Sequence, residues 1–328
     1  MKTKLLFCLA LVLSGGLLAL SNVSQAQFVY SINDGGGAVS ITGYTGSSST
    51  IIIPERMDHL PVVSISGFSH RVFITSVVIP NTVTNIGDYA FTGMDMHSRM
   101  TKLKLGRRVA RIGRDAFSGC DQLTTIALPD SVVSIGAGAF LFCSKLTEIA
   151  IPAGVTNIED GAFSGCFSLK SIIVDPGNPA YCSMDGVLYN KSRTRLLQYP
   201  GGKAGAYIIP KGVTSIAHLA LWNCPHLTGV TMPEGIISIG DEEFAACYNL
   251  ATVIVPASVT NIGQNAFNSC VSMKGIYFCG NAPDYGEYWR GGRAKVLGGL
   301  DTGTVYYVAG TAGWRTNFGG RPTAQWKP

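Results

Sequence analysis

The sequence predicts a β-rich solenoid, a rod of about ten short rungs with a cap at each end. The first observation is a fixed step, because Phe117, Phe140 and Phe163 follow one another at intervals of 23 residues. The second is the composition, since Gly accounts for 40 of 328 residues and charged residues for only 14%. A step this short indicates a stack of similar small units. The composition suits a β-rich extracellular protein better than a disordered chain.

The first 26 residues have the features of a signal peptide. Lys2 and Lys4 give a basic start, residues 5–20 are apolar, and residues 24–26 place small side chains at the two positions that determine cleavage. A membrane anchor is the alternative, but the apolar stretch is short and no later apolar run is long enough to span a bilayer. We therefore expect a mature chain from about Gln27 that is exported and has no transmembrane span. It would be secreted, attached to the cell surface, or periplasmic.

Residues 27–72 are expected to form an N-terminal cap and a first degenerate rung. Residues 41–46 and 47–54 have the pattern of an entry hairpin followed by a rung strand. A solenoid exposes its core at both ends unless it is capped, so a segment of this kind is needed there.

One complete rung shows how the repeated unit is expected to fold. In residues 146–152, Ile149 and Ile151 alternate with polar or small side chains, which is the period of a half-buried strand. The proline that closes this segment ends the strand, because proline cannot donate to a ladder. Residues 155–158 form a second extended segment, and residues 159–165 form a turn or short helical piece that folds the chain back.

The residue that ends the first strand recurs once in each rung, so its occurrences give the number of rungs. Ten positions are equivalent: Pro54, Pro80, Gly106, Pro129, Pro152, Asp175, Pro210, Pro233, Pro256 and Cys279. The step is 23 residues from Gly106 to Asp175 and again from Pro210 to Cys279, whereas the step from Pro80 to Gly106 is 26. Ten rungs at about 4.8 Å each give a rod about 48 Å long.

The repeated pattern is Leu-x-x-Ile-x-Ile-Pro, then Val-x-x-Ile, then Ala-Phe, then Cys. It resembles the BspA-type (Treponema-type) leucine-rich repeat of bacterial surface proteins, and the resemblance covers residues 73–281. This resemblance implies a right-handed solenoid with parallel strands. It also implies a binding or adhesive role rather than an enzymatic one.

Six cysteines occupy one position of the repeat. They are Cys120, Cys143, Cys166, Cys224, Cys247 and Cys270. With Cys182 and Cys279 they make eight cysteines after the leader, which in an exported chain could form four disulfides. Side chains that point the same way in neighbouring rungs do not converge as a disulfide requires, so a buried thiol ladder is the preferred interpretation. The spacing offers no zinc site, and the sequence predicts no metal or other cofactor.

The regular step breaks once, at residues 176–209. Residues 175–179 are dense in turn formers, and residues 186–190 and 194–199 flank a short polar segment as the strands of a β-hairpin do. An insert of this kind resembles one that is common in the family. It is either a structural hairpin that replaces part of a rung or a protruding loop that contacts a partner.

Residues 282–328 are rich in glycine and aromatic side chains. Residues 304–308 are expected to form a strand. The segment is interpreted either as a C-terminal cap or as a sugar-binding platform that includes Trp289 and Trp314.

Nothing in the chain predicts catalysis. The five histidines lack metal-ligand spacing, and no nucleophile elbow, phosphate loop or zinc-protease helix is present. The acidic residues 159–160 and 241–243 follow the second strand of their rungs and are expected in solvated turns.

The charge of the chain is weakly basic. The formal net charge of +5 falls to +3 without Lys2 and Lys4, which is too little to predict nucleic-acid binding. A local exception is a basic cluster formed by Lys102, Lys104, Arg107, Arg108, Arg111 and Arg114.

The outward positions of the first strand form the candidate binding face. The residues singled out are Lys102, Lys104, Glu148, Ser171, Ile173, Ile208, Thr231, Ile254 and Tyr277. Uncharged solvent-facing positions in a row indicate an interaction surface, although strand propensity alone also favours Val, Ile and Thr there. We expect an exported, non-catalytic repeat protein that binds an extracellular protein or matrix ligand through this face. The alternatives are carbohydrate binding by the C-terminal aromatic residues and a structural role in a surface layer.

Overall fold

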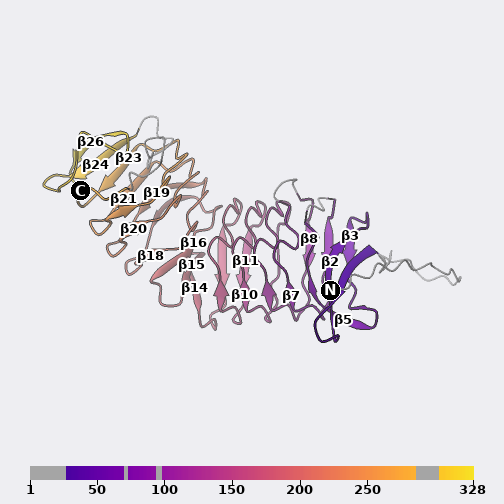
Figure 1. Ribbon diagram of the computed structural model, residues 1–328. Coiled ribbons are helices and arrows are strands. Elements are labelled where there is room, and N and C mark those ends of the chain that lie inside the picture. Colours follow the sequence, from indigo (N-terminus) through magenta and orange to yellow (C-terminus); the bar gives the residue numbers. More distant parts are fainter. Residues whose placement is uncertain (1–26, 70–72, 94–97, 286–302) are drawn as a thin grey trace.

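The computed structural model describes residues 27–69, 73–93, 98–285 and 303–328. The expected leader and Trp289 therefore lie outside the described residues. The described chain is a parallel β-solenoid without helices, and it runs as an elongated body from the indigo end to the yellow end in Figure 1. The predicted fold class is confirmed.

The first column of strands corresponds to the Leu-x-x-Ile-x-Ile segment of each rung. Its members are β3 (Thr50–Ile52), β6 (Ser76–Val78), β8 (Lys102–Lys104), β11 (Glu148–Ile151), β13 (Ser171–Val174), β17 (Gly205–Ile208), β19 (Leu227–Thr231), β21 (Thr252–Val255), β23 (Gly275–Phe278), β24 (Thr304–Val308) and β26 (Arg321–Trp326). Hydrogen bonds join them into three sheets, β3-β6-β8, β11-β13 and β17 to β26. The first gap falls at residues 124–127, which form no strand.

The second column corresponds to the Val-x-x-Ile segment. Its members are β2 (Val39–Tyr44), β5 (Leu60–Ile65), β7 (Asn85–Ile86), β9 (Arg111–Ile112), β10 (Ser134–Ile135), β12 (Asn157–Ile158), β18 (Ser215–Ile216), β20 (Ser238–Ile239) and β22 (Asn261–Ile262). Within each sheet of these columns, neighbouring strands pair in parallel, mostly with equivalent repeat positions opposite each other. The second column is interrupted between β12 and β18 and between β18 and β20.

The two ends are closed by antiparallel pairs. At the N-terminal end, β1 (Phe28–Ile32) pairs with β2, and β4 (Arg56–Met57) pairs with β5. At the C-terminal end, β25 (Asn317–Phe318) pairs with β26. The first column extends past the predicted end of the repeats at residue 281, because β24 and β26 pair in parallel beyond β23.

A stack of aromatic rings fills the core on one side of the rod. The rings of Phe91, Phe117, Phe140 and Phe163 lie parallel at 5.5–5.6 Å from centroid to centroid. Each ring covers the next, so one ring at this position of each rung satisfies the packing, and the 26-residue step from Phe91 to Phe117 preserves it. Leu221 takes this position after the insert, and the stack resumes with Phe244 and Phe267.

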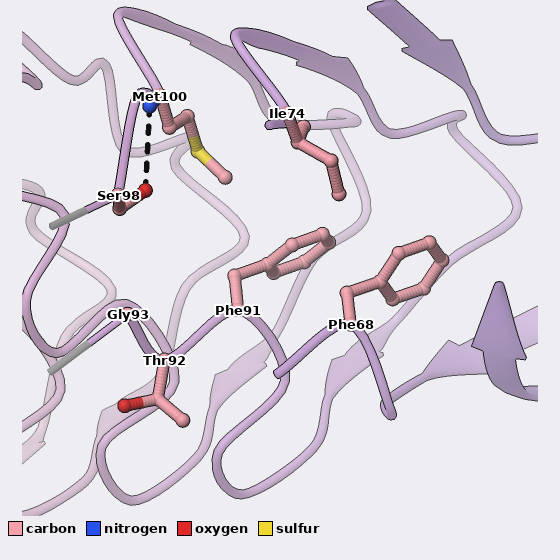
Figure 2. Close-up of a pocket in the computed structure, with 7 residues that line it drawn as sticks. All are labelled: Phe68, Ile74, Phe91, Thr92, Gly93, Ser98 and Met100. Carbon is pink, nitrogen blue, oxygen red and sulfur yellow. Dashed lines mark hydrogen bonds between the residues drawn. The ribbon is translucent and has the colours of Figure 1, made fainter. Parts of the chain in front are cut away.

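A small cavity lies where the 26-residue step departs from the repeat. Its lining is drawn in Figure 2: Phe68, Ile74, Phe91, Thr92, Gly93, Ser98 and Met100. The cavity measures about 10 Å³, which is room for about one water molecule, so it is a packing irregularity and not a ligand site.

The insert forms a three-stranded antiparallel unit. It consists of β14 (Tyr181–Met184), β15 (Val187–Asn190) and β16 (Arg195–Gln198), and β16 continues in parallel to β18 of the second column. Val187, Leu188 and Tyr189 are fully buried. The unit is therefore part of the core, and its longest exposed stretch is the turn at residues 191–194.

The insert also interrupts the first column. The Ile172 N–H of β13 donates to the carbonyl oxygen of Gly186 at 2.8 Å, so the turn between β14 and β15 occupies the edge of β13. Figure 1 shows the body bending at the segment from β14 to β18. The insert thus separates the strands β3 to β13 of the first column from the strands β17 to β26, which run in a different direction from them in Figure 1.

Candidate binding faces

The register brings four of the predicted face residues side by side. Ile208, Thr231, Ile254 and Tyr277 lie opposite one another on β17, β19, β21 and β23. Ile208 is 73% exposed, although a large apolar side chain usually avoids water. We call these four residues the apolar column.

The other predicted face residues lie apart from the apolar column. Ile173 lies on β13, is 45% exposed and pairs with Ala150 of β11. The insert separates it from Ile208. Glu148 and Ser171 lie opposite each other on β11 and β13. Lys102 and Lys104 lie on β8, beyond the gap at residues 124–127. The structure thus divides one predicted face into three patches.

An aromatic cluster that sequence reasoning missed extends the apolar column. Tyr306 lies opposite Tyr277, and their rings are parallel at 4.7 Å. Trp326 meets Tyr277 edge-on at 5.1 Å, and its Nε1–H donates to the carbonyl oxygen of Phe278 at 3.3 Å. A Cβ at Gly275 would lie 2.9 Å from both tyrosine rings, so glycine makes room for them. The step from Tyr277 to Tyr306 is 29 residues, so the 23-residue period gave no signal.

Trp314, the described member of the predicted sugar-binding platform, packs into the C-terminal end. Its ring contacts Phe278, Tyr307 and Phe318, and its Nε1–H donates to the carbonyl oxygen of Gly280 at 3.2 Å. These contacts close the last rungs of the core.

The six ladder cysteines lie buried at one corner of the rungs. All eight cysteines in the described residues are unpaired. The Cys143 thiol donates to the carbonyl oxygen of Phe117 at 3.3 Å, and the Cys166 thiol donates in the same way to Phe140 at 3.2 Å. Burial raises the pKa of the Cys120 and Cys166 thiols to about 12, so these thiols are poor nucleophiles at neutral pH.

Glu243 overturns one expectation from the sequence. Residues 241–243 were expected to lie in a solvated turn, but Glu243 is only 1% exposed. It stands where neighbouring rungs have the alanine before the core ring, as at Ala220 and Ala266. Its Oε1 accepts a hydrogen bond from the Leu221 N–H at 3.2 Å, and burial raises its pKa to about 8.

The described residues lack two kinds of feature, namely metal-ligating groups of side chains and membrane-spanning helices. Within them, no group of His, Cys, Asp and Glu side chains could hold a metal ion. They also contain no helix of the length and apolarity that crossing a bilayer requires.

The stacked parallel strands, with one side of each strand in the core and the other in solvent, define a leucine-rich-repeat solenoid. A family model described as the BspA type leucine rich repeat region matches six copies at residues 63–179 and 204–289, more than half of the chain. The chain therefore belongs to the BspA-type leucine-rich repeat family. The unmatched residues 180–203 fall within the insert.

Solved structures share the fold. The pneumococcal vaccine antigen PcpA is 22% identical, with a TM-score of 0.67, over 87% of this chain and 81% of that one. A leucine-rich repeat protein from Eubacterium ventriosum is 24% identical, with a TM-score of 0.62, over 87% of this chain and 77% of that one. No match was found among curated proteins.

Proposed function

We propose that the protein is an exported, non-catalytic scaffold that binds an extracellular protein or matrix ligand through the apolar column. The observation that carries this proposal is the exposure of Ile208 in line with Ile254 and Tyr277, on neighbouring hydrogen-bonded strands. Protein interfaces are built around apolar and aromatic anchors of this kind. Membership of a repeat family supports the scaffold role, and the antigen PcpA, which shares the fold, is consistent with a location outside the cell.

Lysine substitutions in the apolar column test this proposal. The mature protein is expected to bind at least one member of a panel of purified extracellular and matrix proteins. Replacing Ile208 and Ile254 by lysine should weaken that binding at least tenfold, because two charges would be buried at the interface. The affinity is measured by surface plasmon resonance, and folding is checked by circular dichroism.

A matched control separates loss of the face from a general effect of added charge. Ile237→Lys with Val271→Lys changes two apolar side chains that are each 64% exposed and lie outside the first column. Binding should be unchanged in this control. Equal losses in both double variants, or no binding by the unmodified protein, would contradict the proposal.

A second candidate function is the binding of neutral glycans. It is favoured by the cluster of Tyr277, Tyr306 and Trp326, because the neighbour of Tyr306 on the last strand is the small Ala324. One face of the Tyr306 ring therefore has no aromatic neighbour in the next strand. If glycans bind there, an array of neutral oligosaccharides should give signals that Trp326→Ala reduces at least fivefold. The control with Ile237→Lys and Val271→Lys should leave these signals unchanged. A signal that Trp326→Ala leaves unchanged would exclude this site.

A further inference from the structure

One rung of the first column carries four basic side chains side by side. Lys102 and Lys104 are the outward residues of β8, and Arg107 and Arg108 lie in the turn that follows. All four are exposed. Outward residues two apart on a strand are about 7 Å from each other, which applies to Lys102 and Lys104. The two arginines follow in the turn of the same rung. We call these four residues the basic rung.

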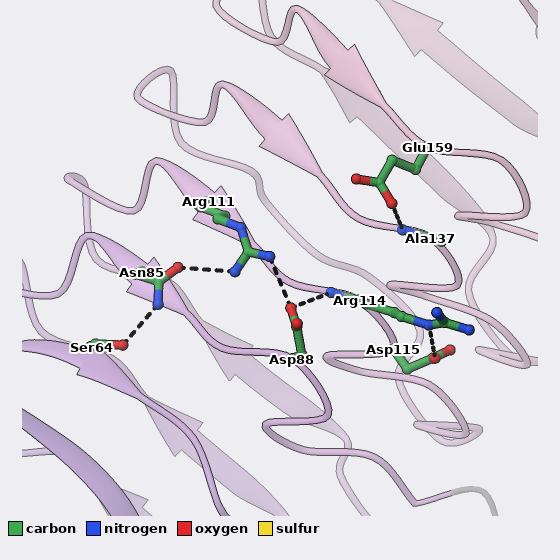
Figure 3. Close-up of polar contacts among 8 residues, drawn as sticks. All are labelled: Ser64, Asn85, Asp88, Arg111, Arg114, Asp115, Ala137 and Glu159. Atoms are coloured by element: carbon green, nitrogen blue, oxygen red, sulfur yellow. Dashed lines mark hydrogen bonds and ion pairs between the residues drawn. The ribbon is translucent and has the colours of Figure 1, made fainter.

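The four side chains have no acidic partners among the described residues. The other two members of the basic cluster, Arg111 and Arg114, do have acidic partners, which Figure 3 shows. Arg111 lies 2.9 Å from an oxygen of Asp88, and Arg114 lies 3.3 Å from an oxygen of Asp115. Those two charges are locally compensated, whereas the basic rung keeps four uncompensated cations close together. These four exposed cations are therefore open to contact with an anionic ligand.

The surroundings of the basic rung are nearly neutral and then acidic. On one side the strand neighbours of Lys102 and Lys104 are Ser76 and Val78. On the other side the equivalent repeat positions are held by Thr125 and Ala127, with Asp130 exposed in the following turn and Glu148 exposed one rung further. At these strand and turn positions the positive charge is therefore confined to a line one rung wide, which is about 5 Å.

The width of this line decides the kind of ligand. A nucleic-acid duplex or a lipid surface presents many negative charges over a broad area, and Asp130 and Glu148 would repel it. Proteins that bind single-stranded nucleic acid add aromatic side chains on which the bases stack, and here the neighbouring positions are Val78 and Ala127. A narrow, flexible polymer with sulfate or carboxylate groups can follow the basic rung without lying over Asp130 and Glu148. It has no bases, so it needs no aromatic side chains to stack on.

We propose that the basic rung binds a linear acidic polysaccharide, with Lys102, Lys104, Arg107 and Arg108 contacting its sulfate or carboxylate groups. The polysaccharide would lie across the rod, along β8 and the turn after it. This site is independent of the apolar column, which lies beyond the insert on β17 to β23.

Heparin, a sulfated polysaccharide, is the probe that tests this site. The mature protein is expected to bind heparin at physiological ionic strength, and binding should weaken as salt is added because the contacts are solvent-exposed. Replacing Lys102, Lys104, Arg107 and Arg108 by glutamine should weaken binding at least tenfold. The affinities are measured by isothermal titration calorimetry, with circular dichroism as the check on folding.

The control variant removes the same charge elsewhere. It replaces Lys170, Lys211, Lys274 and Arg315, four exposed basic residues spread over other rungs, by glutamine. This control should keep heparin affinity within threefold. Equal losses in the two variants would show a net-charge effect, and absence of binding, or tighter binding of duplex DNA than of heparin, would also overturn the proposal. The Ile208 and Ile254 lysine variant should retain heparin binding, so the polysaccharide site and the protein-binding proposal fail separately.

Discussion

Replacing Glu243 by glutamine is expected to stabilise the protein at neutral and alkaline pH by on the order of 4 kcal/mol. The Glu243 carboxyl group is buried where other rungs have alanine, and its pKa is raised from 4.5 to about 8. Glutamine keeps an oxygen to accept the hydrogen bond from the Leu221 N–H and cannot ionise. The substitution therefore removes the cost of protonating the carboxylate on folding, and above about pH 8 the cost of burying it charged, and it retains the contact.

The sign of the pH dependence follows from the raised pKa. The folded state binds a proton more tightly than the unfolded state, so folding takes up a proton between the two pKa values. The contribution of Glu243 to the free energy of unfolding is fully present below pH 4.5. It falls as the pH rises towards about 8 and is constant above that. Glutamine should give no gain at pH 4 and its full gain at pH 8.5.

Urea denaturation of both proteins at pH 4, 6 and 8.5 measures this difference, and the comparison cancels titrations that the two proteins share. Glu242→Gln is the control, because Glu242 is exposed and lies in the same turn. It should change the free energy of unfolding by less than about 0.5 kcal/mol. A gain for Glu243→Gln that is the same at all three pH values would contradict the assignment of a buried, protonated carboxyl group.

Replacing Phe140 by alanine is expected to lower the free energy of unfolding by about 3–5 kcal/mol. The Phe140 ring is fully buried and lies 5.6 Å from the rings of both Phe117 and Phe163. Removing it leaves a cavity and breaks two ring contacts, one with each neighbouring rung. In a solenoid each rung is stabilised by its two neighbours, so both interfaces of this rung weaken.

Phe142→Ala is the matched control for Phe140→Ala. Phe142 lies two residues further along the same corner and is only partly buried, with edge contacts to Phe167 and Trp222. Guanidinium denaturation should show a clearly smaller loss for this variant. A similar loss for the two variants would mean that the ring stack contributes no more than a surface contact.

The repeated architecture was predictable because one packing rule acts on every rung. A ring at position 117 requires another at 140 and 163, and alternation at Ile149 and Ile151 requires a strand. The two strand columns and the buried corner cysteines follow from that pattern. The 23-residue period ends before β24 and β26. Their parallel pairing with the first column therefore could not be predicted from the repeat.

The candidate face was less predictable than the fold. Ile173 and Ile208 have equivalent repeat positions, yet the turn between β14 and β15 takes the edge of β13 and separates them. Glu243 was placed in solvent because three acidic residues in a row are typical of a turn. Its alignment with Ala220 and Ala266 was the available signal that this one side chain points inward.

The corner thiols have a consequence for how such a chain evolves. Five of the six ladder cysteines donate to the carbonyl oxygen of the core-ring position of the preceding rung, whereas Cys224, the first after the insert, donates to Tyr199 and Trp222. No cysteine in the described residues is covalently joined to another. A gene duplication or deletion of one whole regular repeat would therefore leave the thiols of the remaining regular rungs with equivalent acceptors. Length can change by complete repeats with little penalty, whereas a change of any other size needs local accommodation, as in the 26-residue step between Pro80 and Gly106.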